Sequence, residues 1–327
     1  MTLIDNHGRE INYLRLAVTD RCNLRCFYCM PAEGIDYVER SELMSYEELI
    51  RLVSIVTRLG IKKLRITGGE PFLRKDLMEF LRMVQASDIH EVHLTTNGTL
   101  TYDVIPELKE LGIRSVNLSL DSLDKVRFHA ITRRDSFDTV WATFLRLIEF
   151  GITTKINMVV MNGKNIEDLI PMAELAAQYA VDVRFIEEMP FNGTGATPDI
   201  PWTFQRIRSH LHEYFPSLSV QPSAASSTAT QYRVDGFKGS LGIIAAASRT
   251  FCSGCNRLRI TPQGMLRTCL YGEGTFNIQG MMRNGATDEQ ISDALIEAVG
   301  HRAKDGFEAE ARRSNGLISE SMSSIGG

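Results

Sequence analysis

Apolar and polar positions in the first half of the chain follow two alternating periods. A helical period of about 3.6 residues runs through 46–59, 102–111 and 137–150. A glycine ends each stretch, as a helix C-terminus favours, and a short strand-like segment follows it. With three further segments of the same kind, the expected strands are 13–19, 63–67, 91–96, 115–120, 155–161 and 182–187.

Strands that alternate with helices predict a parallel sheet with the helices outside it. A closed (βα) barrel needs eight such units. The six units expected here therefore leave two architectures, a partial and open barrel or a doubly wound sheet. The periodicity alone does not choose between them.

The regular alternation stops after residue 188, and we expect a domain over 1–190 and a C-terminal region over 191–327. Gly, Pro, Thr and other small residues mark loops in this region, between segments of helical or strand-like period. The expected elements are a loop at 189–201, a helix at 202–214, a loop at 223–230, a hairpin of 231–234 with 240–245, and a helix at 287–299.

The composition narrows the functional classes. The 327 residues carry a net charge of −4, so no global positive field marks a protein that binds nucleic acid or a membrane surface. The N-terminus has no secretory signal pattern, and no apolar run is long enough to span a bilayer. We expect a cytoplasmic protein. Thiols stay reduced in that compartment, which makes the six cysteines candidate metal ligands.

Cys22, Cys26 and Cys29 form a C-x3-C-x2-C triplet directly after the first expected strand. In parallel α/β folds the chemistry gathers at this end of the strands. Three thiolates can hold a [4Fe–4S] cluster with one open iron, whereas four-cysteine ferredoxins close all four irons. An open iron can chelate S-adenosylmethionine, and the reduced cluster can then release a 5′-deoxyadenosyl radical. Zinc is the alternative, but it usually takes four ligands.

The triplet, with Tyr28 before its last cysteine, resembles the signature of the radical S-adenosylmethionine superfamily. The Thr-Gly-Gly-Glu-Pro segment at 67–71 extends the resemblance. It implies that Tyr28 lies against the adenine of the cofactor and that Gly69, Ser119 and Met189 contact it. Pro190 departs from the family pattern and stiffens the loop after Met189.

A second triplet, Cys252, Cys255 and Cys269, has the spacing C-x2-C-x13-C and no neighbouring histidine. This is close to a zinc ribbon without its fourth ligand, and a second open cluster accounts for all six cysteines. Arg257 and Arg259 follow on one face of an expected strand, where two guanidinium groups suit phosphate oxygens.

Other basic residues lie on the expected strands. A charge on a largely apolar strand must reach solvent or a partner, so their convergence suggests a polyanionic substrate such as a nucleoside triphosphate. Taken singly, each also fits a strand end whose charge reaches water. These residues are Arg15, Lys63, Arg65, Lys155 and Arg184.

In order and spacing, the motifs resemble the GTP 3′,8-cyclases of molybdenum cofactor biosynthesis over nearly the whole chain. The resemblance implies a partial six-unit (βα) TIM-like barrel whose open side is closed by the C-terminal region. It also implies two [4Fe–4S] clusters, S-adenosylmethionine, and GTP as substrate, with guanine at the second cluster. The matching segments are 22–31, 67–71, 184–187, 252–259 and 322–327.

The same resemblance implies roles for individual residues. A terminal Gly-Gly is ordinarily a frayed end, but here Gly326 and Gly327 would enter the active site and take part in catalysis. The residues implied to hold GTP are Arg15, Arg65, Thr96, Lys155, Arg257 and Arg259, with Lys63 and Arg184 as further candidates.

The implied reaction removes the C3′ hydrogen of the GTP ribose and joins C3′ to C8 of guanine, giving (8S)-3′,8-cyclo-7,8-dihydro-GTP, the first step of the pathway. Implied partners are a flavodoxin- or ferredoxin-like electron donor and cyclic pyranopterin monophosphate synthase as the next enzyme. The sequence leaves the oligomeric state open, a homodimer included. Two other functions also remain open: a peptide-modifying radical enzyme, which usually carries more cysteines, and a non-enzymatic iron–sulfur or zinc protein.

Overall fold

The computed structural model describes residues 2–224, 226–314, 316 and 318–326. Parallel strands of the first half form the centre of one sheet, and the six-strand prediction is confirmed with small shifts at the strand ends. These strands are β1 (Tyr13–Ala17), β2 (Lys63–Thr67), β3 (Glu91–Thr96), β4 (Ser115–Ser119), β5 (Thr153–Val160) and β6 (Asp182–Glu187).

The C-terminal region adds strands to both edges of this sheet. They are β7 (Ser219–Gln221), β8 (Ala229–Arg233), β9 (Ser240–Ile244), β10 (Arg257–Ile260) and β11 (Leu266–Arg267). Within the described ranges the order is β11-β10-β1-β2-β3-β4-β5-β6-β9-β8-β7. The expected hairpin is confirmed as antiparallel β8 and β9. The domain boundary near residue 190 stays a prediction, because the residues after it build onto the same sheet.

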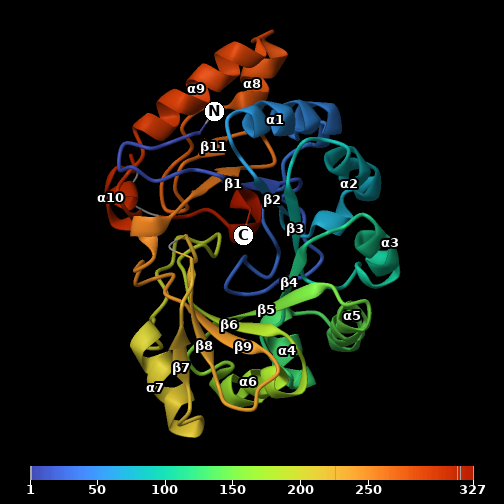
Figure 1. Cartoon of the computed structure of the whole chain (residues 1–327), viewed down its shortest axis with the longest axis vertical. Coiled ribbons are helices and arrows are strands. Elements are labelled where there is room, and N and C mark those ends of the chain that lie inside the picture. Colours follow the sequence, from blue (N-terminus) through green and yellow to red (C-terminus); the bar gives the residue numbers. More distant parts are fainter. Residues whose placement is uncertain (1, 225, 315, 317, 327) are drawn as a thin grey trace.

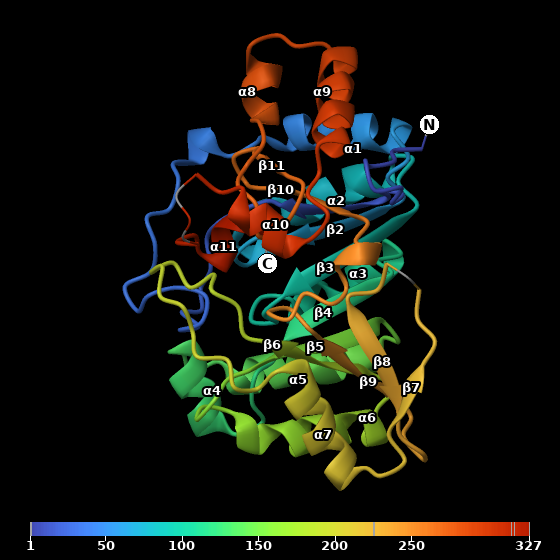
Figure 2. The same ribbon diagram turned by 90° about the vertical axis from the view of Figure 1, so that its left-hand side faces the viewer.

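Helices cover the outer face of the sheet, as Figures 1 and 2 show. Those of the first half are α1 (Tyr46–Arg58), α2 (Leu77–Gln85), α3 (Ile105–Glu110), α4 (Lys125–Thr132), α5 (Phe137–Glu149) and α6 (Leu169–Gln178). Those of the second half are α7 (Phe204–Tyr214), α8 (Ile278–Arg283), α9 (Asp288–Gly300) and α10 (Gly306–Ala311), whereas α11 (Met322–Ile325) lies on the inner side of the sheet. Short 3-10 helices occur at Arg40–Glu42, Pro71–Leu73, Tyr102–Val104, Ile166–Asp168 and Cys252–Gly254.

Alternation along the strands separates an apolar outer face from a polar inner face. Leu14 and Leu64 are fully buried in one apolar cluster with residues of α1 and α2. On the opposite, inner face of the sheet, Arg15 of β1 lies in register with Arg65 of β2 and with Arg259 of β10. The inner face of this curved sheet therefore forms a polar lumen, which purely apolar parallel strands would not.

The described sheet stays open, with β11 and β7 at its two edges. This arrangement confirms the partial TIM-like barrel. The chain's C-terminal residues run along the inner side, close to β1 and β2 (Figure 1). In α11, Ser323 and Ile325 are buried, so the described part of the tail is not a frayed end. Among the described residues, no helix has both the length and the apolarity needed to cross a bilayer.

Candidate active site

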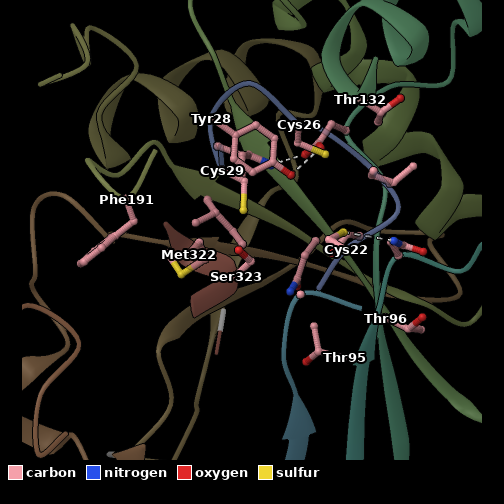
Figure 3. A pocket seen from close by; sticks show the side chains of 18 of the residues that line it. Cys22, Cys26, Tyr28, Cys29, Thr95, Thr96, Thr132, Phe191, Met322 and Ser323 are labelled. Carbon is pink, nitrogen blue, oxygen red and sulfur yellow. Dashed lines mark hydrogen bonds between the residues drawn. The ribbon is translucent and has the colours of Figure 1, made fainter. Parts of the chain in front are cut away.

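A pocket of about 1140 Å³, its open mouth included, lies at the C-terminal ends of the central strands (Figure 3). Small-molecule sites usually measure about 300–1,000 Å³, so this pocket has room for a cluster and a nucleoside cofactor. All three cysteines of the first triplet line it. The other predicted cofactor contacts also line it, namely Tyr28, Gly69, Ser119 and Met189.

The thiols of the first triplet are held neutral by burial. Burial raises the pKa of Cys22 to about 12 and that of Cys29 to about 11, and it raises the pKa of Cys26 well above the ordinary value of a thiol. A bound metal deprotonates a coordinating thiol outright, because the cation supplies the charge that the protein does not. The three half-buried cysteines lie in one loop after β1 and line one pocket, and thiolates are the ligands that an iron–sulfur cluster takes.

Gly69 brings the glycine-rich segment into contact with the cysteine loop. Its backbone N–H donates to the carbonyl of Thr19 at 2.9 Å. A β-carbon at residue 69 would lie 2.4 Å from the carbonyl oxygen of Arg21 and 2.7 Å from that of Asp20. No side chain fits this approach, so only glycine lets the backbone border the pocket here.

Glu70 is a site residue that the sequence reasoning did not single out. Its buried carboxylate accepts hydrogen bonds from the Thr96 hydroxyl at 2.9 Å and the Asn97 backbone at 2.7 Å. Burial raises the pKa of Glu70 to about 7. The Asn97 amide in turn donates to the Cys22 sulfur at 3.7 Å. Glu70 thus joins the ends of β2 and β3 to the cysteine loop. In the sequence, the one feature that could have indicated this role is a carboxylate placed just after a strand.

Tyr28 is fixed in the pocket by a second buried carboxylate that was also missed. Its hydroxyl donates to Asp121 Oδ2 at 2.8 Å, and Asp121 Oδ1 accepts from the Val159 backbone at 2.8 Å. The ring consequently borders the pocket beside Cys26 and Cys29 (Figure 3). This is the position an aromatic residue needs in order to lie against a bound base.

Thr96 does not present its hydroxyl to the lumen. It donates to Glu70, and the register pairs Thr96 with Leu118 on the outer face. Its neighbour Thr95 pairs with the inward Asn117, and Figure 3 shows the two threonines on opposite sides of β3. Both threonines line the pocket, but strand alternation turns the Thr95 hydroxyl toward the lumen, and the role of Thr96 as a substrate contact stays a prediction.

Several polar atoms on the inner face make no hydrogen bond with any described residue. Buried polar groups are normally paired, so such a group marks a place where a ligand can bind. These atoms belong to four neighbouring strands, β2 to β5, one atom from each strand. They are Thr67 Oγ1, Thr95 Oγ1, Asn117 Oδ1 and Asn157 Oδ1.

Positive charge gathers on the inner faces of β1, β2 and β10. Arg65 donates to the Tyr13 hydroxyl at 2.5 Å and to the Leu94 carbonyl at 2.7 Å. Burial alone would raise the pKa of Tyr13, but Arg65 and Arg15 lower it to about 8. The structure thus brings together Arg15, Arg65, Arg257 and Arg259, as the sequence analysis expected.

The remaining predicted cations differ in how far they are already neutralised. Lys63 pairs with Glu91 at 3.1 Å, and Arg184 pairs with Asp182 at 2.6 Å. Lys155 makes no hydrogen bond or ion pair with the described residues. Burial and nearby Arg184 lower the pKa of Lys155 to about 8. Lys155 is therefore better placed than Lys63 or Arg184 to pair with an anion in the lumen.

The second cysteine triplet is surrounded by buried arginines. Arg302, another residue that the sequence reasoning missed, donates to the Cys255 sulfur at 3.1 Å and to the Cys255 carbonyl at 2.7 Å. Arg9 donates to the Cys252 carbonyl at 2.9 Å. Burial would raise the pKa of Cys255, but Arg302 and Arg257 lower it overall. This cationic shell suits an anionic thiolate cluster. No sequence spacing links Arg9 or Arg302 to the triplet.

Gly326 reaches the arginine cluster from the other end of the chain. Its carbonyl accepts a hydrogen bond from Arg259 at 2.7 Å. A β-carbon at residue 326 would lie 2.9 Å from Ala17 and from Thr67, and its φ of +77° favours glycine. Gly326 thus lies in the lumen beside predicted substrate contacts. Gly327, the other predicted tail residue, lies outside the described residues.

Comparisons with known proteins agree with this geometry. Residues 16–176 match the Radical SAM superfamily, and residues 181–307 match the family Molybdenum Cofactor Synthesis C. A protein of Desulforamulus reducens named GTP 3′,8-cyclase is 38% identical over 99% of this chain and 100% of its own length. A Syntrophomonas wolfei protein of the same name is 39% identical over 95% of this chain and 98% of its own length.

Structural neighbours share the fold at low sequence identity. Streptococcus suis SuiB bound to its precursor peptide SuiA has a TM-score of 0.64 and 13% identity, covering 90% of this chain and 66% of SuiB. Native anSMEcpe with bound AdoMet has a TM-score of 0.55 and 17% identity, covering 86% of this chain and 84% of its own. Both likenesses support the fold alone and carry no information on substrate.

Proposed function

Because the chain belongs to the GTP 3′,8-cyclase family of radical S-adenosylmethionine enzymes, which serves molybdenum cofactor biosynthesis, we propose that it converts GTP to (8S)-3′,8-cyclo-7,8-dihydro-GTP. One observation carries the proposal. The pocket of the first cysteine triplet opens onto a lumen in which Arg15, Arg65, Arg257 and Arg259 converge. A triphosphate is the kind of ligand that matches such a surplus of positive charge.

We propose a [4Fe–4S] cluster on Cys22, Cys26 and Cys29, and a second one on the later triplet of Cys252, Cys255 and Cys269. When bound, the clusters and S-adenosylmethionine supply the electron and the carbon-centred radical that removes a hydrogen atom from the ribose. The chain's residues would hold that cofactor: the Gly69 backbone borders it, Ser119 and Met189 line its pocket, and Tyr28 offers a ring for its adenine.

The same residues would position the substrate. GTP and its cyclic product are isomers, but the hydrogen atom taken from C3′ leaves in 5′-deoxyadenosine. Each turnover would therefore consume one S-adenosylmethionine, and one further electron and one proton would complete the product, while the protein holds C3′ and C8 near each other. Forked hydrogen bonds from Arg257 and Arg259 of β10 would fix the phosphates. Lys155 of β5 would add a further positive charge. Gly326 is proposed to complete the site, since its carbonyl already lies against Arg259.

The finer context belongs to the same proposal. A flavodoxin- or ferredoxin-like protein would deliver the electron, and cyclic pyranopterin monophosphate synthase would take the product. The cytoplasm is the proposed compartment, since an oxygen-sensitive cluster and free thiols need reducing conditions.

The test is anaerobic reconstitution of the full chain with iron and sulfide, followed by incubation with S-adenosylmethionine, a chemical reductant and GTP as sole substrate. We expect one 5′-deoxyadenosine per cyclised nucleotide, identified by mass spectrometry, and no turnover with ATP. Release of 5′-deoxyadenosine that does not depend on GTP would contradict the proposal and favour a radical enzyme with another substrate.

A further inference from the structure

The last described residues, 318–326, form a segment that we call the C-terminal strap. It pairs with the loop that follows β6. The Met322 N–H donates to the Phe191 carbonyl at 3.0 Å, and Ser321 forms an antiparallel bridge with Asn192. Backbone pairing of this kind ties a chain end down without needing a regular sheet.

The strap also forms a wall of the cofactor pocket. Met322 and Ser323 line the pocket, and Figure 3 shows both side chains beside Cys29. The Ser321 hydroxyl donates to the Cys29 carbonyl at 2.7 Å. A ligand in this pocket would therefore touch residues from the first cysteine loop and from the end of the chain at once.

A buried ionic clamp holds the start of the strap. Glu320 accepts from Arg267 at 2.5 Å and from Arg313 at 2.9 Å. The two arginine side chains are 7% and 4% exposed, and Glu320 is 24% exposed. Both arginines also donate to the Gly272 carbonyl, three residues after Cys269. The clamp thus fastens the strap to the second cysteine loop, while Glu320 itself does not line the pocket.

We propose that Glu320 is a positioning residue: its clamp with Arg267 and Arg313 holds the C-terminal strap as a wall of the S-adenosylmethionine pocket. The inference rests on the proposed function, because it takes that cofactor as the pocket's ligand. Loss of the carboxylate removes the Glu320 charge that faces both buried arginines, which is an unfavourable change. The strap then separates from the pocket, and the binding-competent population falls.

The test compares Glu320→Gln with wild type in the full, anaerobically reconstituted chain. Hydrogen exchange read by mass spectrometry should show lost protection over 318–326. The apparent Kd for S-adenosylmethionine should rise about tenfold if the ordered strap falls to about one tenth of the molecules. Iron content should not change. Glu310→Gln is the matched control, because it breaks the Arg249–Glu310 pair, also 2.5 Å long, outside the strap.

Two more variants keep the outcome decisive. Met322→Ala removes a wall side chain with the clamp intact, so cofactor affinity should fall while protection of 318–321 persists. If Glu320→Gln does not fold, Glu320→Asp keeps the charge between the arginines and should give the same changes at smaller size.

Wild-type exchange and wild-type affinity in the Glu320 variant would overturn the inference. Failure of the wild type to cyclise GTP, with the strap behaving as described, would instead overturn the proposed function alone.

Discussion

Gly69 packs its backbone against the cysteine loop with no room for a β-carbon. Gly69→Ala should push the two loops apart, costing about 1–3 kcal/mol of unfolding free energy and weakening S-adenosylmethionine binding. Denaturant unfolding and equilibrium binding measure the two effects. Gly300→Ala is the control, because a β-carbon there meets nothing within 4 Å. Unchanged cofactor affinity in Gly69→Ala would contradict this account of the loop contact.

Thr95 and Thr96 are adjacent residues for which the structure predicts opposite effects. Thr96→Val removes a donor from the buried Glu70 carboxylate, and we expect a stability loss of about 1–3 kcal/mol with GTP affinity retained. Thr95→Val removes an inward hydroxyl that makes no hydrogen bond with described residues, so GTP affinity should fall with little loss of stability. Thermal unfolding and GTP titration distinguish them. The reverse pattern would restore Thr96 as the substrate contact.

The lowered pKa of Lys155 leads us to expect that GTP binding depends on pH. Burial and Arg184 lower its pKa to about 8, from an ordinary value of 10.5, and Asp182 offsets this in part. Below pH 8 the free protein carries the charge that attracts phosphate. As pH rises through 8 the amine becomes neutral, so GTP affinity should fall. The charged groups around it are Arg184, Asp182, Arg65 and Lys63.

The measurement is the Kd for GTP between pH 7 and 9. Lys155→Arg should remove its share of the dependence, because a guanidinium stays charged over this range. Tyr13 also has a pKa of about 8 and would add negative charge to the lumen on ionising. Tyr13→Phe isolates that contribution. A pH dependence that is the same in wild type and Lys155→Arg would exclude the lysine as its source.

At the scale of elements, the short strand β10 has one face toward the lumen and one face in the apolar core. Arg257 and Arg259 face the lumen, while Leu258 and Ile260 are buried on the outer face. Arg257→Ala should weaken GTP binding about ten- to a hundredfold, since one charge-assisted contact contributes about 1.5–3 kcal/mol. GTP titration of the folded variant measures this. An unchanged Kd would refute the role of Arg257.

The core side of β10 gives the complementary prediction. Leu258→Ala leaves a cavity in the apolar cluster shared with α1 and α2, and should cost about 2–5 kcal/mol of unfolding free energy. The folded fraction should bind GTP as wild type does. If this variant lost GTP affinity instead of stability, the assignment of the two faces of β10 would be wrong.

At the scale of the whole molecule, the two cysteine triplets should bind metal independently. We expect about eight irons per chain after anaerobic reconstitution. The triple variant Cys252→Ser, Cys255→Ser, Cys269→Ser should keep about four, still bind S-adenosylmethionine, and lose cyclisation of GTP. Iron and sulfide analysis with electron paramagnetic resonance tests this. Zinc at the second triplet, or an unchanged iron content in the variant, would contradict a second cluster.

Local pattern was sufficient for much of this molecule. The periods of 3.6 and 2 residues located β1 to β6 and the helices that begin near residues 46, 137 and 287, because apolar side chains must face the same core. The cysteine spacing, the glycine-rich segment and the paired arginines of β10 pointed to the chemistry, because ligands to one group must be close in a loop or on one strand face.

Contacts between distant segments were decided only by the tertiary structure. The partners of Cys255 include Arg302, and the wall beside Cys29 includes Met322. No local period records such pairs. Which residues of β3 face inward at its end also depends on the register with β4. That register turns Thr95 inward and Thr96 toward Glu70. Sequence by itself determined which elements and which ligand types this chain has; the packing of residues far apart along it determined which side chains share a site, because burial and counter-charge are properties of neighbours in space.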